Sequence, residues 1–261
     1  GPLEDGRYHL FVAWTCPWAH RTLLARALKG IDGIQVHWAN ELTEKSWRFE
    51  TPDASPHGHR HLYELYLRAD PAYTGRVTVP VLWDEAEQRI VNNESSEILA
   101  MLDALPSEAP ALRPEAHLDA IEGWNEALYD SLNNGVYRAG FATTQAAYDE
   151  AVFGVFAMLA RLESHLEGRD WLVGDQVTEA DLRLFVTTFR FDGAYVPFFR
   201  CNLKRLADHP NLLAHMQRVY ALPGVAATCD LGAMRRGYAS IEAVNPTGIV
   251  PIGPPTHLVA G

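Results

Sequence analysis

Residues 8–28 constrain the fold more than any other part of this chain, because they read as a buried strand that turns directly into a helix. Residues 8–13 form an almost continuous apolar run, as expected for a strand in a core. Pro17 stands where the helix begins, and proline suits that place because its missing N–H would be unpaired there anyway. Cys16 is thereby predicted at the mouth of the turn, where free N–H groups and the helix dipole favour a thiolate.

The position three residues after Cys16 decides what kind of thiol chemistry is open to it. A redox Cys-x-x-Cys motif would have a second cysteine there, and this chain has Ala19. A lone sulfur cannot close a local disulfide, so a thiol from outside must resolve any intermediate, and glutathione is the usual small one. The alternative is a small, inert buried cysteine, but position and context favour a nucleophile.

Composition narrows the class of protein further. The chain has 261 residues, enough for two modest domains, and a formal net charge of -11, which disfavours nucleic acid and anionic membranes as partners. Its 3 cysteines are few and odd in number, as is typical of a reducing, cytoplasmic compartment. No apolar run is long enough to cross a bilayer. Because the first strand starts so early, we expect that a natural N-terminal segment is missing.

The first part of the chain alternates strand and helix patterns. After the first strand and helix come a second strand, a long polar stretch read as an insertion or active-site loop, a short helix, a hairpin of two strands and a further helix. The second strand is predicted over residues 34–39, the polar stretch over 41–61 and the short helix over 62–67. The two strands of the hairpin are predicted over residues 78–84 and 88–91, and the last helix over 94–102.

A proline interrupts the strand predicted over residues 78–84. Pro80 is awkward in an ordinary central strand because it cannot donate a ladder hydrogen bond. A cis bond between Val79 and Pro80 removes the difficulty and turns the backbone of Val79 outward, where it can pair with a peptide-like ligand. The thioredoxin fold has such a proline facing its catalytic cysteine.

The second part of the chain is helical. Residues 106–114 read as a linker, and amphipathic helices are predicted over residues 117–133, 145–166 and 211–220. Thr178 and Asp181 have the spacing of a capping box at the start of another helix. We therefore predict a thioredoxin-like α/β domain (residues 1–105), a linker (106–114), an all-α domain (115–244) and an extended C-terminal arm (245–261).

Five motifs occur in an order that resembles one family. Together they are similar to the glutathionyl-hydroquinone reductases, the xi class of the glutathione transferases, and the resemblance covers nearly the whole chain. The motifs are CPWAHR at residues 16–21, GRVTVPVLWD at 75–84, NNESSEI at 92–98, NNGVY at 133–137 and NPTGIVP at 245–251.

The resemblance implies a reaction and the residues that catalyse it. The thiolate of Cys16 would attack the sulfur of a glutathionyl-hydroquinone, and a second glutathione would release the enzyme from the resulting mixed disulfide. Tyr137 matches the proton donor and acceptor for the leaving ring. Tyr195 and Tyr238 match residues that stabilise the thiolate, although Gly237 and Ala239 replace larger residues of the family around Tyr238.

The resemblance also implies a glutathione site and a homodimer. Glutathione would be a co-substrate, with no permanently bound cofactor and no metal; the histidine-rich residues 57–61 read as a solvated loop. The residues expected to cover or line the tripeptide, or to hold its carboxylates and amine, are Trp47, Arg76, Val77, Thr78, Val79, Glu94 and Ser95.

Two other interpretations remain open from the sequence. An omega-like thiol transferase, or dehydroascorbate reductase, would use the same single thiol without the tyrosine-rich pocket. A non-catalytic protein with the same scaffold would bind partners and would not depend on Cys16.

Overall fold

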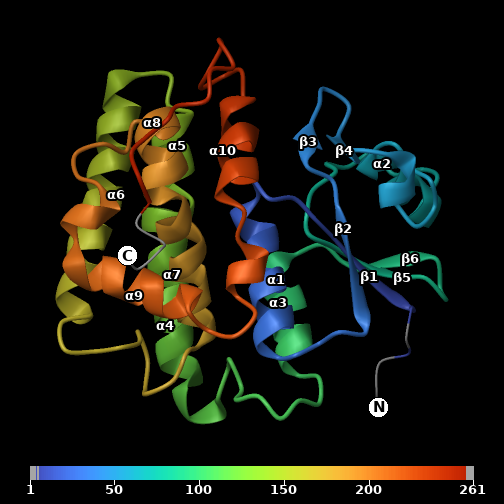
Figure 1. The fold of residues 1–261 in the computed structure, drawn as a ribbon, viewed down its shortest axis with the longest axis horizontal. Helices are drawn as coiled ribbons and strands as arrows, with labels where there is room; N and C mark the ends of the chain where they lie inside the picture. The colour runs from blue at the N-terminus through green and yellow to red at the C-terminus, as the bar shows by residue number, and fades with distance from the viewer. Residues whose placement is uncertain (1–3, 5, 257–261) are drawn as a thin grey trace. The chain divides into compact units, whose positions relative to one another are not determined.

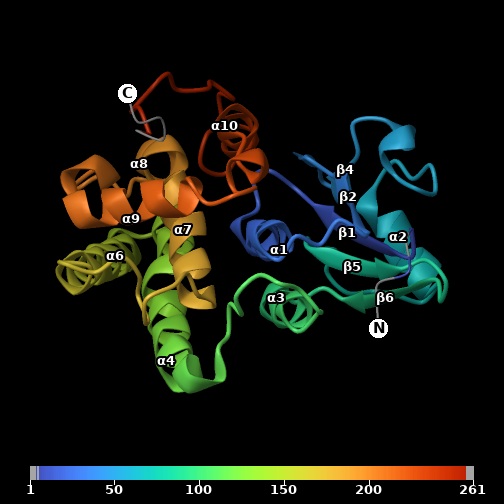
Figure 2. The same cartoon turned by 60° about the horizontal axis from the view of Figure 1, so that its bottom comes forward.

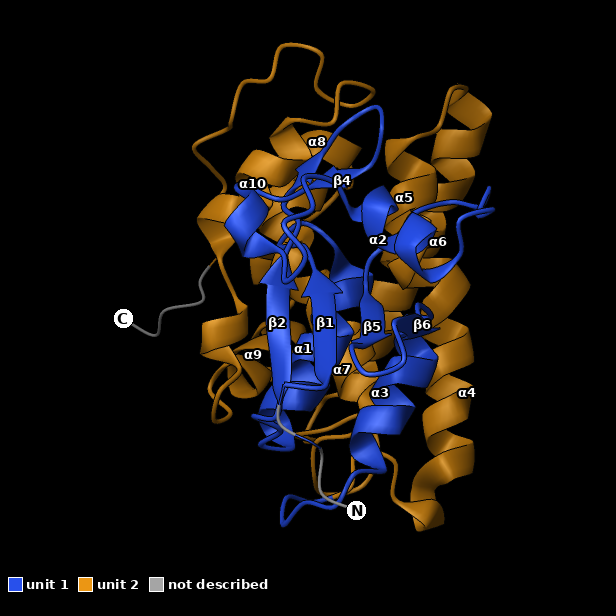
Figure 3. Cartoon of the chain, turned by 90° about the vertical axis from the view of Figure 1, so that its right-hand side faces the viewer, with its two compact units in different colours: residues 1–110 blue, residues 111–261 orange. Residues whose placement is uncertain are grey.

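The computed structural model describes residue 4 and residues 6–256 (Figure 1). It separates into two compact units, residues 1–110 and residues 111–261 (Figure 3). The expectations placed on the first residues of the chain and on the arm beyond residue 256 lie outside the described residues. Each unit is a folded body with its own core.

Unit 1 contains six strands, three α-helices and a short 3-10 turn among its described residues. The strands are β1 (Tyr8–Val12), β2 (Ile34–Trp38), β3 (Glu41–Leu42), β4 (Trp47–Arg48), β5 (Val81–Asp84) and β6 (Arg89–Asn92). The helices are α1 (Pro17–Leu28), α2 (Leu62–Ala69), α3 (Ser95–Asp103) and the 3-10 turn η1 (Pro52–Ala54).

Four strands of unit 1 form a mixed sheet in the order β2-β1-β5-β6. Strand β1 runs parallel to β2 and antiparallel to β5, and β5 runs antiparallel to β6. Helices α1 and α3 pack together on one face of the sheet, and α2 lies on the other side (Figure 2). This arrangement places the N-terminus of α1 at the carboxyl end of β1, as the predicted strand-to-helix turn requires.

The stretch predicted as a loop over residues 41–61 has more structure than expected. Strands β3 and β4 pair in a hairpin that joins Glu41 to Arg48 and Leu42 to Trp47, and the side chains of Glu41 and Arg48 also form an ion pair. Phe49, directly after the hairpin, is buried. Two-residue strands leave no alternation long enough to detect in a sequence.

The described residues of unit 2 form helices joined by loops and contain no strand. Its α-helices are α4 (Leu118–Leu128), α5 (Gly135–Gly140), α6 (Gln145–His165), α7 (Glu179–Arg190), α8 (Val196–Phe199), α9 (Pro210–Tyr220) and α10 (Leu231–Ala239). Two π-type turns, η3 (Tyr129–Asn133) and η4 (Phe191–Tyr195), and three 3-10 turns, η2 (Glu115–His117), η5 (Leu206–Asp208) and η6 (Ala226–Thr228), complete the unit.

Helix α7 is the buried centre of unit 2, and its start has the predicted capping box. Asp181 accepts hydrogen bonds from the backbone and hydroxyl of Thr178 at 2.8 and 2.9 Å. The other oxygen of the same carboxylate accepts from Leu172 N and from His215 Nε2, both at 2.9 Å. All twelve residues of α7 are buried, so this cap fixes the axis around which α4 and α9 pack.

One predicted helix of unit 2 ends early. The helix expected over residues 117–133 is regular only from Leu118 to Leu128 and then widens into the π-type turn η3. A second π-type turn, η4, follows α7 in the same way. Such turns are rare and are found frequently at functional sites. No helix among the described residues is long and apolar enough to span a membrane.

Candidate active site

Cys16 is the N-cap of α1, with Pro17 in the first turn as predicted. Its sulfur accepts a hydrogen bond from the backbone N–H of Ala19 at 3.4 Å, and its side chain is 8% exposed. An N–H donor and the positive end of a helix both stabilise a negative sulfur more than a neutral one. The local structure therefore supplies the conditions for a thiolate.

The bond between Val79 and Pro80 is cis, as predicted. The carbonyl of Val79 faces the sulfur of Cys16 at 3.5 Å and accepts the hydrogen bond of its thiol. Within the described part of the chain, the N–H of Val79 has no hydrogen-bond partner. That N–H is a donor available to a peptide-like ligand lying beside the sulfur.

Tyr66 of α2 holds the segment before Pro80 in place. Its hydroxyl donates to Thr78 O at 3.0 Å and accepts from Thr78 N at 3.3 Å and from Asn93 Nδ2 at 3.2 Å. The loop beside Cys16 is thereby fastened to the residues that open α3. Sequence reasoning missed both Tyr66 and Asn93; the sequence pattern showed Tyr66 only as an aromatic residue in a short predicted helix.

Glu94 and Ser95 stand at the start of α3. Glu94 is the N-cap, and its Oε1 accepts from the backbone of Ser96 at 3.4 Å. Ser95 is buried and Glu94 is exposed. Helix capping is thus one function of Glu94 in this structure, and a helix N-terminus is also a favourable place for a ligand carboxylate.

The remaining predicted glutathione residues lie farther along the same unit. Trp47 is in β4 and is half-buried. Arg76 is exposed, and its carbonyl accepts from the hydroxyl of Tyr73 at 2.7 Å. Val77 is half-buried beside it. The described contacts bring Val79 to Cys16, whereas they show no contact of Trp47 or Arg76 with that sulfur.

The three predicted tyrosines meet in unit 2. The hydroxyl of Tyr238 lies 2.7 Å from that of Tyr137 and 3.2 Å from that of Tyr195. Tyr195 and Tyr238 are fully buried. Burial, followed by the neighbouring Tyr238, raises the pKa of Tyr195 well above its usual value. The Tyr195 hydroxyl therefore stays protonated at neutral pH and can donate a hydrogen bond to an anion.

Phe199 packs against all three tyrosine rings and fixes their orientation. The backbone of α5 approaches this ring so closely that a Cβ on Gly140 would lie 2.4 Å from Phe199. Only glycine fits there, so Gly140 permits the aromatic cluster to form. Ala239, next to Tyr238, is also buried, with 1% of its surface exposed.

The other two cysteines are poor nucleophiles. Burial raises the pKa of Cys201 to about 12 and that of Cys229 to about 11. The three cysteines are all thiols and form no disulfide. Cys16, by contrast, has a backbone N–H donor to its sulfur at a helix N-terminus.

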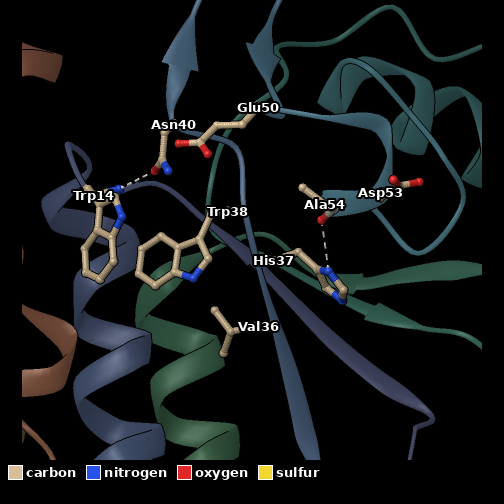
Figure 4. A pocket seen from close by; sticks show the side chains of 8 residues that line it. All are labelled: Trp14, Val36, His37, Trp38, Asn40, Glu50, Asp53 and Ala54. Atoms are coloured by element: carbon tan, nitrogen blue, oxygen red, sulfur yellow. Dashed lines mark hydrogen bonds between the residues drawn. The ribbon is translucent and has the colours of Figure 1, made fainter. Parts of the chain in front are cut away.

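A pocket of about 410 Å³ lies at the base of the β3–β4 hairpin in unit 1 (Figure 4). Trp14 and Trp38 stack in one wall with ring centroids 3.6 Å apart, and Trp14 N donates to Asn40 Oδ1 at 3.1 Å. These contacts brace the turn that leads to Cys16. None of the predicted site residues lines this pocket, whose other lining residues are Val36, His37, Glu50, Asp53 and Ala54.

The histidine-rich residues 57–61 are less solvated than predicted. His57 Nε2 lies 3.0 Å from a carboxylate oxygen of Glu85, and its ring packs edge-on against Trp83. Burial lowers the pKa of both His57 and His59. Among the residues that the structure describes, no group of three or more histidines, cysteines or carboxylates could hold a metal.

Both units match models of known protein families. Residues 15–105 match the glutathione S-transferase N-terminal domain, and residues 145–218 match the glutathione S-transferase C-terminal domain. These matches agree with the predicted thioredoxin-like and all-α architecture, which the structure has.

Two bacterial relatives and one fungal structure define the family more narrowly. The chain is 49% identical to the glutathionyl-hydroquinone reductase PcpF of Sphingobium chlorophenolicum, over 96% of this chain and 84% of the relative. It is 47% identical to the glutathionyl-hydroquinone reductase YqjG of Escherichia coli, over 96% and 80%; the glutathione-bound structure of YqjG superposes with a TM-score of 0.91, over 96% of this chain and 86% of that one. The glutathione transferase Xi of Phanerochaete chrysosporium is 44% identical, with a TM-score of 0.91, over 97% and 86%. This chain therefore belongs to the xi class of glutathione transferases, the glutathionyl-hydroquinone reductase family.

Proposed function

We propose that this protein reduces glutathionyl-hydroquinones to hydroquinones with glutathione as co-substrate. The thiolate of Cys16 attacks the glutathionyl sulfur, so that the bond from sulfur to the ring carbon breaks and a Cys16–glutathione disulfide forms. The ring carbon takes up a proton as it leaves. A second glutathione then attacks this disulfide, which yields glutathione disulfide and restores the thiolate.

The observation that carries the proposal is the placement of a single thiol at a helix N-terminus beside a cis-proline loop. Cys16 has the N–H of Ala19 at 3.4 Å and the carbonyl of Val79 at 3.5 Å. The free N–H of Val79 supports pairing with the cysteinyl backbone of glutathione. Because Ala19 replaces a second cysteine, the mixed disulfide must await an outside thiol.

Glutathione recognition is proposed for the residues around this turn. Arg76 is exposed and offers a guanidinium to a ligand carboxylate. Glu94 and Ser95, at the N-terminus of α3, would hold the amine and the carboxylate of the γ-glutamyl group. Trp47, Val77 and Thr78 would cover and line the tripeptide.

The tyrosines are proposed to act on charge and proton. Tyr137 would donate the proton that the leaving ring carbon needs, and Tyr238, 2.7 Å away, would share the resulting charge. Tyr195 and Tyr238 would stabilise the Cys16 thiolate, since a protonated phenol donates to an anion.

A comparison of two substrates with two variants tests this function. We expect efficient reduction of a glutathionyl-hydroquinone, loss of turnover in Cys16→Ser with glutathione binding retained, and unchanged turnover in the matched Cys229→Ser variant. Activity on a glutathionylated peptide alone would assign an omega-like thiol transferase instead. Turnover that survives Cys16→Ser would contradict the mechanism.

We further propose that the protein works as a homodimer in the cytoplasm. Both statements rest on the family resemblance and on the low cysteine content, which suits a reducing compartment. Sedimentation of the purified chain tests the first statement, and a monomer at micromolar concentration would contradict it.

A further inference from the structure

The C-terminal arm, defined here as residues 245–256, is attached to unit 2 by polar contacts. Arg235 of α10 donates from Nη1 to Ile252 O at 3.0 Å and from Nη2 to Pro254 O at 2.5 Å. Asn245 Nδ2 donates to Ala239 O at 2.7 Å and to Ile249 O at 3.0 Å. One guanidinium thus bridges two carbonyls near the end of the arm, and one amide fixes its beginning.

Three apolar side chains of the arm contribute little to this attachment. Ile252 is 98% exposed, Ile249 is 68% exposed and Val250 is 44% exposed. A side chain that stays in water gains little from hydrophobic burial. The far end of the arm is held through the backbone carbonyls of Ile252 and Pro254, and Arg235 supplies the donors for both of them.

Arg235 and the arm also close over the π-type turn η4. A Cβ built on Gly193 would lie 3.0 Å from Met234 Cε, 3.3 Å from Thr256 Cγ2 and 3.4 Å from Arg235 Nε. Helix α10 and the arm thus pack tightly against the same backbone position. Gly193 is two residues from Tyr195, the last residue of this turn.

The turn η4 and the helix α10 each carry one tyrosine of the proposed active site. Tyr195 ends η4 and Tyr238 lies on α10, and their hydroxyls are 3.2 Å apart. We propose that Arg235 is a positioning residue: by fastening the arm over Gly193, it holds η4 against α10 and so fixes the spacing of these hydroxyls. The catalytic consequence rests on the proposed function, whereas the mechanical one does not.

The mechanical part is tested without any substrate. Thermolysin cuts before Ile and Val unless a proline follows, and the arm offers such sites at Ile249 and Ile252. We expect Arg235→Ala to increase cleavage in the arm about tenfold, since two charge-assisted hydrogen bonds are lost. Amide hydrogen exchange in Phe191–Tyr195 should rise in parallel. In Arg235→Lys one ammonium replaces the forked guanidinium, so its cleavage and its exchange should lie between those of the wild-type protein and of Arg235→Ala.

Arg236→Ala is the matched control, because Arg236 is the exposed neighbour on the same helix. It removes the same charge and should change neither cleavage nor exchange. Equal cleavage of Arg235→Ala and wild-type protein, or faster cleavage without faster exchange in Phe191–Tyr195, would overturn the proposal. An effect of equal size in Arg236→Ala would also overturn it, since charge alone would then be the cause.

The catalytic part is read from kinetics on the folded variants. We expect Arg235→Ala to lower kcat for a glutathionyl-hydroquinone about fivefold and to leave KM for glutathione within about twofold of the wild-type value. In Arg235→Lys, kcat should be partly restored. An unchanged kcat together with a loosened η4 would refute the positioning role. If wild-type protein reduces no hydroquinone, the proposed function fails, while cleavage and exchange still decide whether Arg235 fastens the arm.

Discussion

Acid should weaken unit 1 through His37, whose ring joins β2 to the turn η1. His37 Nε2 lies 2.8 Å from His9 Nδ1, and His37 Nδ1 lies 3.2 Å from Ala54 O. Burial, together with the neighbouring His9 and His57, lowers the pKa of His37 from 6.5 to about 4, and the Ala54 carbonyl opposes this only in part. The folded protein therefore holds a neutral ring where the unfolded chain would bind a proton.

The sign and size of the effect follow from this difference. The pKa of His37 is lower in the folded protein than in the unfolded chain. The neutral ring therefore contributes to the stability of the fold, fully above about pH 6.5, and this contribution is lost as the pH falls towards about 4. Between pH 7.5 and 5.0 the full shift corresponds to about 2 kcal/mol. Because the ring is partly exposed, solvent screening reduces our expectation to about 1 kcal/mol.

Urea unfolding of wild-type protein and His37→Gln at both pH values isolates this contribution. Tryptophan fluorescence is a suitable signal because most tryptophans of the chain lie in unit 1. Protonation of other groups is common to the two proteins and cancels. The wild type should lose about 1 kcal/mol more than the variant on going to pH 5.0. Equal losses, or a smaller loss in the wild type, would refute the reasoning.

Three further perturbations test the site and its support. Tyr137→Phe should slow hydroquinone reduction about a hundredfold while glutathione affinity changes less than about twofold; equal losses in both would argue against a proton role. Asp181→Ala should lower the free energy of unfolding by about 3 kcal/mol or more, because it leaves buried donors unpaired. Thr178→Ala should lower it by about 1 kcal/mol. A calorimetric measurement in which Thr178→Ala is the more destabilising change would contradict the capping account. Alkylation of Cys16 followed against pH should have its midpoint well below the ordinary thiol pKa of about 8.5, and an ordinary midpoint would remove the activated thiolate.

Local signals in the sequence predicted the turn at Cys16 and the cap of α7. A cysteine followed by proline after an apolar run, and a threonine three residues before an aspartate, fix geometry through near neighbours alone. The cis bond at Pro80 could also be inferred, because a proline inside a strand pattern has few solutions. Family resemblance supplied Tyr137, Tyr195 and Tyr238, which no local pattern singles out.

The features that sequence reasoning missed depend on contacts between distant residues. Widening of a helix into η3 leaves the apolar periodicity before it unchanged, so the predicted helix ran on to residue 133. The burial of His57 depends on Trp83 and Glu85, which are far away in sequence. The role proposed for Arg235 depends on carbonyls of the arm, and a carbonyl has no sequence signature.

The central claim is that one thiol receives glutathione. At pH 7.5 a pKa of about 12 for Cys201 and about 11 for Cys229 leaves a thiolate fraction below about one in a thousand at each site. Intact mass and peptide mapping after treatment with glutathione disulfide should therefore find one adduct, on Cys16, which added glutathione removes. An adduct on Cys201 or Cys229 in an enzyme that still turns over, with Cys16 unmodified, would contradict the account.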